Sequence, residues 1–223
     1  MRVAAYYAPF PEDPLWQNAA CWLGRDPETN ETLAQPEIPL IQKVTAEPRL
    51  YGFHATLKPP FRLADGARWD DLLQAFIKLA AGFAPFELPS LAIADVHGFL
   101  ALRETMPCPA LQALADASVA HLDTFRAPPS EDELARRRRA GLTSQEEAGL
   151  ARWGYPYVFG TWFFHMTLTR RLTAPEKQIF LPAAQRHFAR AIAMPREVGD
   201  ICLFAQSAPG EPFVIVRRFP LRD

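Results

Sequence analysis

The chain has 223 residues, of which 49% are hydrophobic and 12% aromatic, enough for one large domain or two small lobes with a packed core. The net charge of −1 lacks the strong asymmetry typical of nucleic-acid and membrane-surface proteins, although 20 of the 24 basic residues are arginines, which favour phosphate or carboxylate. No apolar run reaches the roughly 18 residues of a membrane-spanning helix, and neither a signal peptide nor paired cysteines are visible. We therefore expect a cytoplasmic protein without a disulfide framework or zinc site.

The predicted elements alternate between strands and helices along the chain. Hydrophobic spacing and turn signals predict, in chain order, a strand at 2–7, helices at 15–23 and 69–83, strands at 86–96 and 99–103, and helices at 110–125 and 175–194, followed by strands at 198–206 and 212–220. Between the two halves, Ser130 to Arg152 contains two helix starts and five arginines balanced by five acids, which indicates an inserted helical hairpin.

One short pattern occurs twice, as Phe53-His54-Ala55-Thr56-Leu57 and as Phe164-His165-Met166-Thr167-Leu168. Strict alternation predicts a strand with one buried face and one face that carries His and Thr. Each copy is followed by a helix and two strands, so an α+β unit is duplicated. We expect an α+β fold of two pseudo-symmetric lobes of antiparallel sheet with flanking helices around a central cleft, in which the two His-Thr pairs meet.

The repeats are expected at about 12–105 and about 110–220 of a single bilobal domain spanning 1–223, with the helical insertion at about 130–152.

Two His-x-Thr motifs on duplicated α+β lobes resemble the 2H phosphoesterase superfamily, which includes 2'-5' RNA ligase-like proteins and cyclic phosphodiesterases. The longer wording, Arg49 to Phe61 together with Trp153 to Val158 and Phe164 to Thr169, resembles the subgroup found with phosphonate-utilisation operons. The resemblance covers nearly the whole chain. It implies a hydrolase that needs no metal or other cofactor and acts on a cyclic phosphate or related phosphodiester.

The resemblance implies catalytic roles for His54, Thr56, His165 and Thr167. Opening a cyclic phosphodiester needs a base, an acid and donors to the phosphoryl oxygens. Imidazole titrates near pH 6.5, so one neutral and one protonated histidine can divide the proton transfers while the threonines hold the phosphate. Which histidine is the acid stays open.

Further residues are candidates for binding the substrate. By even spacing, Lys58 shares the His54 face, and Thr169 and Arg171 continue the His165 face. The aromatic side chains near the motifs are candidates for lining the cleft and stacking on a base or ribose: Tyr6, Tyr51, Tyr157 and Phe163. Each of these side chains also has a purely structural interpretation.

The partner we expect is a small phosphorylated molecule, either a nucleotide or a ribose cyclic phosphate. RNA end processing is the alternative within catalysis, although the near-neutral charge makes it less favoured. A protein that binds nucleotides or sugar phosphates without turnover is the alternative outside catalysis. A metal site on the two histidines is disfavoured because neither motif offers a carboxylate or thiolate. Arginines of the hairpin at 130–152 either face solvent or reach over the cleft to a second phosphate.

Overall fold

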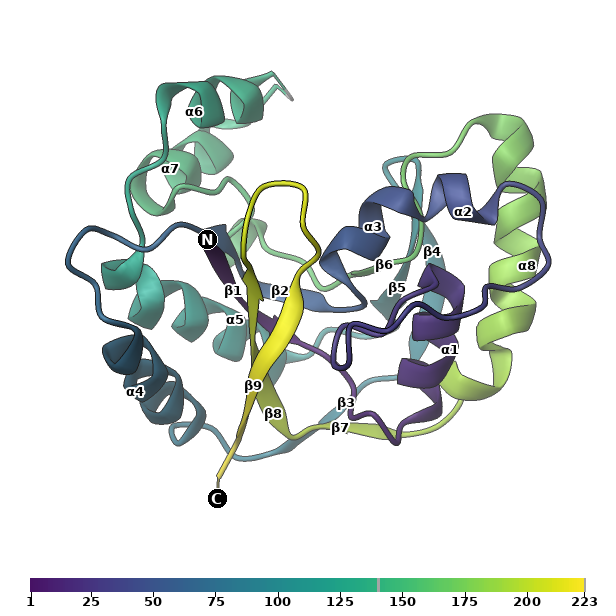
Figure 1. Ribbon diagram of the computed structural model, residues 1–223, viewed down its shortest axis with the longest axis horizontal. Helices are drawn as coiled ribbons and strands as arrows, with labels where there is room; N and C mark the ends of the chain where they lie inside the picture. The colour runs from purple at the N-terminus through teal and green to yellow at the C-terminus, as the bar shows by residue number, and fades with distance from the viewer. Residues whose placement is uncertain (140, 223) are drawn as a thin grey trace.

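The computed structural model describes residues 1–139 and 141–222, and over these residues the chain forms one antiparallel sheet of seven strands in the order β4-β5-β6-β2-β1-β8-β9 (Figure 1). A separate pair, β3 with β7, lies apart from this sheet. The strands are β1 Arg2–Tyr7, β2 Ala55–Phe61, β3 Phe86–Leu88, β4 Leu91–Val96, β5 Phe99–Glu104, β6 Met166–Thr167, β7 Arg196–Val198, β8 Asp200–Gln206 and β9 Val214–Pro220.

Helices flank this sheet in two groups. In Figure 1, α4 and α5 lie together near one end, whereas α1 and α8 lie together near the other, as their contacts also show. The helices are α1 Pro14–Leu23, α2 Ile41–Val44, α3 Ala46–Tyr51, α4 Trp69–Ala80, α5 Pro109–Leu122, α6 Glu131–Arg138, α7 Ser144–Trp153 and α8 Ala174–Ile192, with 3-10 turns η1 Asp123–Phe125 and η2 Phe159–Thr161. The predicted α+β class with antiparallel sheet and flanking helices is confirmed, and the strands of the two predicted lobes join in one continuous seven-stranded sheet.

Local sequence explains where the flanking helices begin. The Asp13 side chain accepts a hydrogen bond from the backbone N–H of Leu15 and so caps α1, which has proline at its first position and ends at Gly24 in the left-handed conformation. Thr173 and Glu176 form a reciprocal capping box at the start of α8. These signals agree with the predicted helix positions to within a few residues.

The two halves of the chain exchange elements. The first motif strand, β2, is followed by α4 and the β4-β5 hairpin, and the second, β6, by α8 and the β8-β9 hairpin. However, β5 pairs with β6, while α4 packs against β8 and β9 and α8 packs against β4. Each half therefore contributes its helix to the other half's hairpin. The motif strands consequently pair with each other at the sheet centre, through Ala55 and Met166.

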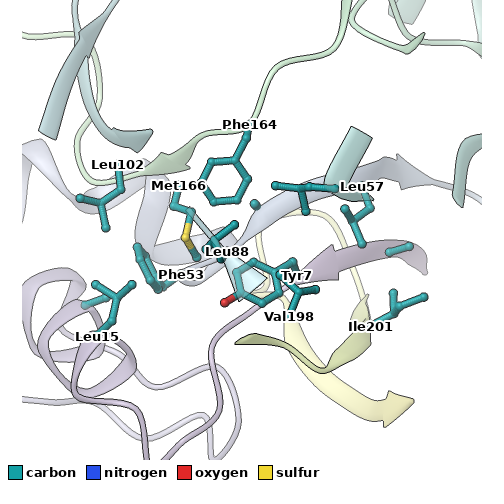
Figure 2. Packing of buried hydrophobic residues seen from close by; sticks show 14 of the residues in the cluster. Tyr7, Leu15, Phe53, Leu57, Leu88, Leu102, Phe164, Met166, Val198 and Ile201 are labelled. Carbon is teal, nitrogen blue, oxygen red and sulfur yellow. The ribbon is translucent and has the colours of Figure 1, made fainter. Parts of the chain in front are cut away.

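The apolar faces of the two motifs lie in the core (Figure 2). Phe53, Leu57, Phe164 and Met166 are each at most 1% exposed and belong to one cluster with residues of β1, β5 and β8. Each large buried side chain of this kind contributes about 1.5–3 kcal/mol of hydrophobic stabilisation. One face of each motif strand is therefore packed into the core, while the histidine and threonine side chains are directed away from this cluster.

The segment between the halves folds as the expected helical hairpin. Ser130 and Thr143 each form a capping box with the glutamate three residues later, at the starts of α6 and α7. Arg138 and Glu147 join the two helices through an ion pair at 2.6 Å. Figure 1 shows this hairpin projecting beyond the sheet near the N-terminus.

Within the described residues, no helix combines the length and apolar character needed to cross a bilayer.

Candidate active site

The two histidines are held in the same way. His54 directly precedes β2 and His165 directly precedes β6, so the pairing of these strands brings the two rings to one cleft. Nδ1 of His54 lies 2.9 Å from the Gly52 carbonyl oxygen, and Nδ1 of His165 lies 3.2 Å from that of Phe163. A carbonyl oxygen only accepts, so Nδ1 is the protonated nitrogen in both rings. Nε2 is then the nitrogen that can exchange a proton with a ligand.

Each histidine has a threonine on its strand, as the motif predicts. The Thr56 hydroxyl lies 3.3 Å from Nε2 of His54. Thr167 lies on β6, where its backbone pairs with Ala101 of β5, and both threonines line the cleft. Two hydroxyls and two imidazoles thus surround one space.

Aromatic rings support both histidines. Tyr6 on β1 pairs with Thr56 in the sheet and stacks on the His54 ring at a centroid distance of 3.7 Å and an interplanar angle of 14°. The rings of Phe163 and Phe99 lie 4.8 and 5.9 Å from that of His165. These contacts restrict the ring planes, and both histidines are half-buried in the wall of the cleft.

Burial keeps both histidines neutral. Loss of hydration lowers the pKa of His54 from 6.5 to about 3, with the carbonyl of Gly52 opposing this shift and the nearby His165 adding to it. Burial also lowers the pKa of His165, and the charge of Arg103 contributes in the same direction. Both shifts favour the neutral imidazole in the protein without a bound ligand. An acid role requires a bound anion that raises a histidine pKa.

The cleft has a volume of about 830 Å³ and a cationic lining. Among the described residues, five arginines and one acid, Glu47, contribute to its walls. The arginines come from three separate parts of the chain: Arg2, Arg136, Arg137, Arg170 and Arg171. Because the whole chain carries a net charge of only −1, this concentration of positive charge is local and favours an anionic ligand.

Three of the expected binding residues, Tyr6, Tyr51 and Arg171, line this cleft. Tyr157 and Phe163 do not. Tyr157 packs edge-to-face on Tyr155 at 5.6 Å, and Phe163 lies beside His165 with the Arg103 guanidinium over its ring. Their places are therefore behind the cleft wall.

Lys58 does not share the His54 face. Thr56 pairs with Tyr6, but Lys58 pairs with the adjacent Ala5, so β2 contains an extra residue and bulges between these positions. The bulge reverses the alternation, and the Lys58 ammonium lies 3.0 Å from both the Val119 carbonyl oxygen and a carboxylate oxygen of Asp123. Thr169 is likewise buried, where its hydroxyl accepts a hydrogen bond from the Leu100 N–H.

Several lining residues had no assigned place in the cleft from sequence. Tyr155 and Arg170 belong to this group, and so does Arg2. Arg136 and Arg137 were visible only as part of a basic run, and facing the cleft was one of two interpretations of that run. Their orientation depends on how the hairpin packs, which local patterns do not encode.

The fold and the cleft define an α+β protein in which two histidine-threonine pairs share one cationic cleft. The chain belongs to the family described as Protein of unknown function (DUF1045), which matches residues 56–214. It is similar to two curated proteins called "Ribose 1,5-bisphosphate phosphokinase PhnN". The protein from Janthinobacterium sp. (strain Marseille) is 39% identical over 98% of this chain and 50% of its own length, and the protein from Laribacter hongkongensis (strain HLHK9) is 37% identical over 97% and 51%. The chain thus spans about half the length of these relatives.

Solved structures with a related arrangement include E. coli LigT in its apo form and in complex with 3'-AMP, both with a TM-score of 0.48, 14% identity, and coverage of 100% of this chain and 98% of that chain. A further one is titled "Crystal structure of phosphoesterase", with a TM-score of 0.46 and 14% identity. The resemblance to the 2H phosphoesterases rests on the two His-x-Thr motifs.

Proposed function

We propose that the protein hydrolyses a small cyclic phosphate or phosphodiester, with His54 and His165 as the acid-base pair and Thr56 and Thr167 as donors to the phosphoryl oxygens. The observation that carries the proposal is the matched geometry of the two histidines. Each ring donates Nδ1–H to the carbonyl two residues earlier, and each leaves Nε2 for one shared cleft. A protein that only binds anions needs donors, and it does not need two basic nitrogens held in this way.

In the proposed reaction, the neutral Nε2 of one histidine takes a proton from water as the water oxygen bonds to phosphorus. The bond from phosphorus to the leaving alkoxide breaks, and the other histidine, protonated in the complex, transfers its proton to that oxygen. One water is added and a phosphate monoester with a free hydroxyl results. Which of the two histidines is the base and which is the acid stays open.

Negative charge on the phosphoryl oxygens is balanced by the cleft. Threonine hydroxyls donate hydrogen bonds, and arginines such as Arg171 supply positive charge. No group of three or more His, Cys, Asp or Glu suited to a metal occurs among the described residues. The proposed chemistry uses protein groups alone.

A phosphorylated ribose is the substrate class we favour. The subgroup resemblance points to phosphonate utilisation, and the relatives' name refers to a ribose bisphosphate. Those relatives are about twice as long as this chain, so the kinase activity in their name belongs to those longer proteins and is not assigned to this chain. A cyclic ribose phosphate opened by this chain would give a ribose phosphate monoester of related chemistry.

Phosphorus NMR of EDTA-treated protein with a panel of 2',3'-cyclic nucleotides and ribose cyclic phosphates tests the proposal. We expect turnover that is lost in His54→Ala and in His165→Ala and kept in His121→Ala, whose histidine is exposed and outside the cleft. Near-normal turnover in either motif variant would contradict the two-histidine mechanism. Binding without turnover across the panel would instead indicate a protein that only binds these ligands.

A further inference from the structure

The arginines of the cleft differ in how far their charge is neutralised. Arg170 is held by Glu176, with contacts of 2.7 and 3.1 Å to the two carboxylate oxygens. Arg136 and Arg137, by contrast, have no carboxylate within 4.0 Å among residues 1–139 and 141–222. Both belong to α6 of the inserted hairpin, and both line the cleft. Arg136 does help to lower the pKa of the Glu133 carboxyl, but at a longer range. The hairpin therefore presents to the cleft two arginines that are not held in a close ion pair.

Arg137 is connected to the catalytic end of the cleft through aromatic rings. Its guanidinium lies over the Tyr155 ring, 4.5 Å from the centroid. Tyr155 lies near enough to Tyr6 to influence the pKa of that residue, and Tyr6 stacks on His54 at 3.7 Å. Tyr6, Tyr155 and His54 all line the same cleft. The arginine therefore approaches the histidines from the side, separated from them by two aromatic rings.

The position of Arg137 is fixed before any ligand binds. Stacking on Tyr155 restricts the guanidinium, and the capping box at Ser130 together with the Arg138–Glu147 ion pair restricts α6. A side chain already ordered loses less conformational entropy when a ligand arrives. This arrangement is that of a binding group rather than a solvated surface charge.

The chemistry of the pair selects a phosphate. The guanidinium groups of Arg136 and Arg137 offer several N–H donors that match the oxygens of a phosphate monoester, whereas a nucleobase offers no matching charge. An extended RNA backbone fits less well, because the same hairpin carries five acidic residues that offset its charge: Glu131, Asp132, Glu133, Glu146 and Glu147.

We propose that Arg136 and Arg137 form a second phosphate subsite, so that the preferred substrate carries a phosphate monoester in addition to the phosphate that reacts at the histidines. This inference rests on the proposed function and specifies its substrate: a bisphosphorylated sugar-sized molecule. The hairpin is then the element that selects this substrate.

A matched pair of ribose cyclic phosphates, one with a phosphate on the 5-oxygen and one without, tests the subsite. We expect the wild-type kcat/KM for the phosphorylated member to be higher by about tenfold or more, as charge-assisted hydrogen bonds to arginine provide. Arg137→Gln and Arg136→Gln should each reduce kcat/KM for the phosphorylated member, mainly through KM, and should reduce it much less for the unphosphorylated member. Arg139→Gln is the control, because it removes the same charge from the end of α6 at a position outside the cleft.

Equal losses on both substrates, or no preference in the wild type, would overturn the subsite. So would a clear preference for a short RNA with a cyclic phosphate end over both small molecules.

Titration calorimetry with ribose 5-phosphate separates this inference from the proposed function, since binding needs no turnover. Binding weakened in Arg136→Gln/Arg137→Gln and retained in His54→Ala supports the subsite even where no substrate reacts, and binding equal in all three proteins refutes it.

Discussion

At the scale of single residues, the lowered histidine pKa values determine the pH dependence of catalysis. The value of kcat/KM reports the free enzyme, in which the acid must be protonated. Because burial lowers the pKa of both histidines below 6.5, whichever of them is the acid, we expect kcat/KM to fall with rising pH along a limb whose midpoint lies below pH 6.5. In the complex the substrate phosphate raises that pKa, so the corresponding limb of kcat should lie at higher pH. Initial rates between about pH 4 and 9 measure both limbs, and coincident limbs would contradict this account.

The same histidines affect stability. The pKa of His54 is about 3 in the folded protein, against 6.5 without burial. Between these values the unfolded chain binds a proton that the native state excludes, so stability falls as pH falls from 6.5 towards 3. Each pH unit in this window costs at most about 1.4 kcal/mol. When the pH falls from 6.5 to 5.0, the free energy of unfolding measured by urea denaturation should decrease in the wild type. In His54→Gln this decrease should be smaller by about 1–2 kcal/mol. His121→Gln is the control and should match the wild type.

At the scale of elements, the bulge in β2 changes the role of Lys58. The buried ammonium joins β2 to the end of α5 through Val119 and Asp123, and Asp123 also binds Arg126 at 2.8 Å. Removing one partner of a buried ion pair costs about 3–5 kcal/mol. We therefore expect Lys58→Ala to lower the free energy of unfolding by about 3 kcal/mol and to leave kcat/KM of the folded enzyme unchanged. A large loss of kcat/KM at full folding would restore the substrate-binding role that its spacing suggests.

Local patterns predict the elements better than they predict the faces of the strands. Alternation identified both motifs, and capping signals placed α6, α7 and α8, because these features depend on neighbouring residues alone. Lys58 was assigned to the cleft because even spacing assumes a regular strand, and a bulge leaves no clear mark in the sequence. The cleft-facing side of Arg136 and Arg137 depends on the packing of the hairpin, so only the structure places them.

At the scale of the whole molecule, the exchange of elements explains why the two motifs form one site. The hairpin β4-β5 pairs with β6, and β1 joins β2 to β8, so strands from both halves alternate across the continuous sheet. The indole N–H of Trp162 also donates a hydrogen bond to the Thr56 carbonyl oxygen at 2.8 Å. This bond links the segment just before the second motif to β2, the strand of the first motif. The repeat limits of about 12–105 and 110–220 remain a prediction about sequence duplication.

The distribution of charge over the molecule predicts how the enzyme responds to salt. A net charge of −1 gives no long-range attraction for an anion, so any attraction must come from the arginines of the cleft. Salt screens such attraction over a Debye length of about 10 Å at 0.1 M. We expect kcat/KM for an anionic substrate to fall as NaCl rises from about 20 to 200 mM, and to fall less steeply in Arg171→Gln. Arg139→Gln changes the net charge equally but lies outside the cleft, so its salt dependence should match the wild type. Equal slopes in both variants would mean that net charge, and not the cleft, attracts the substrate.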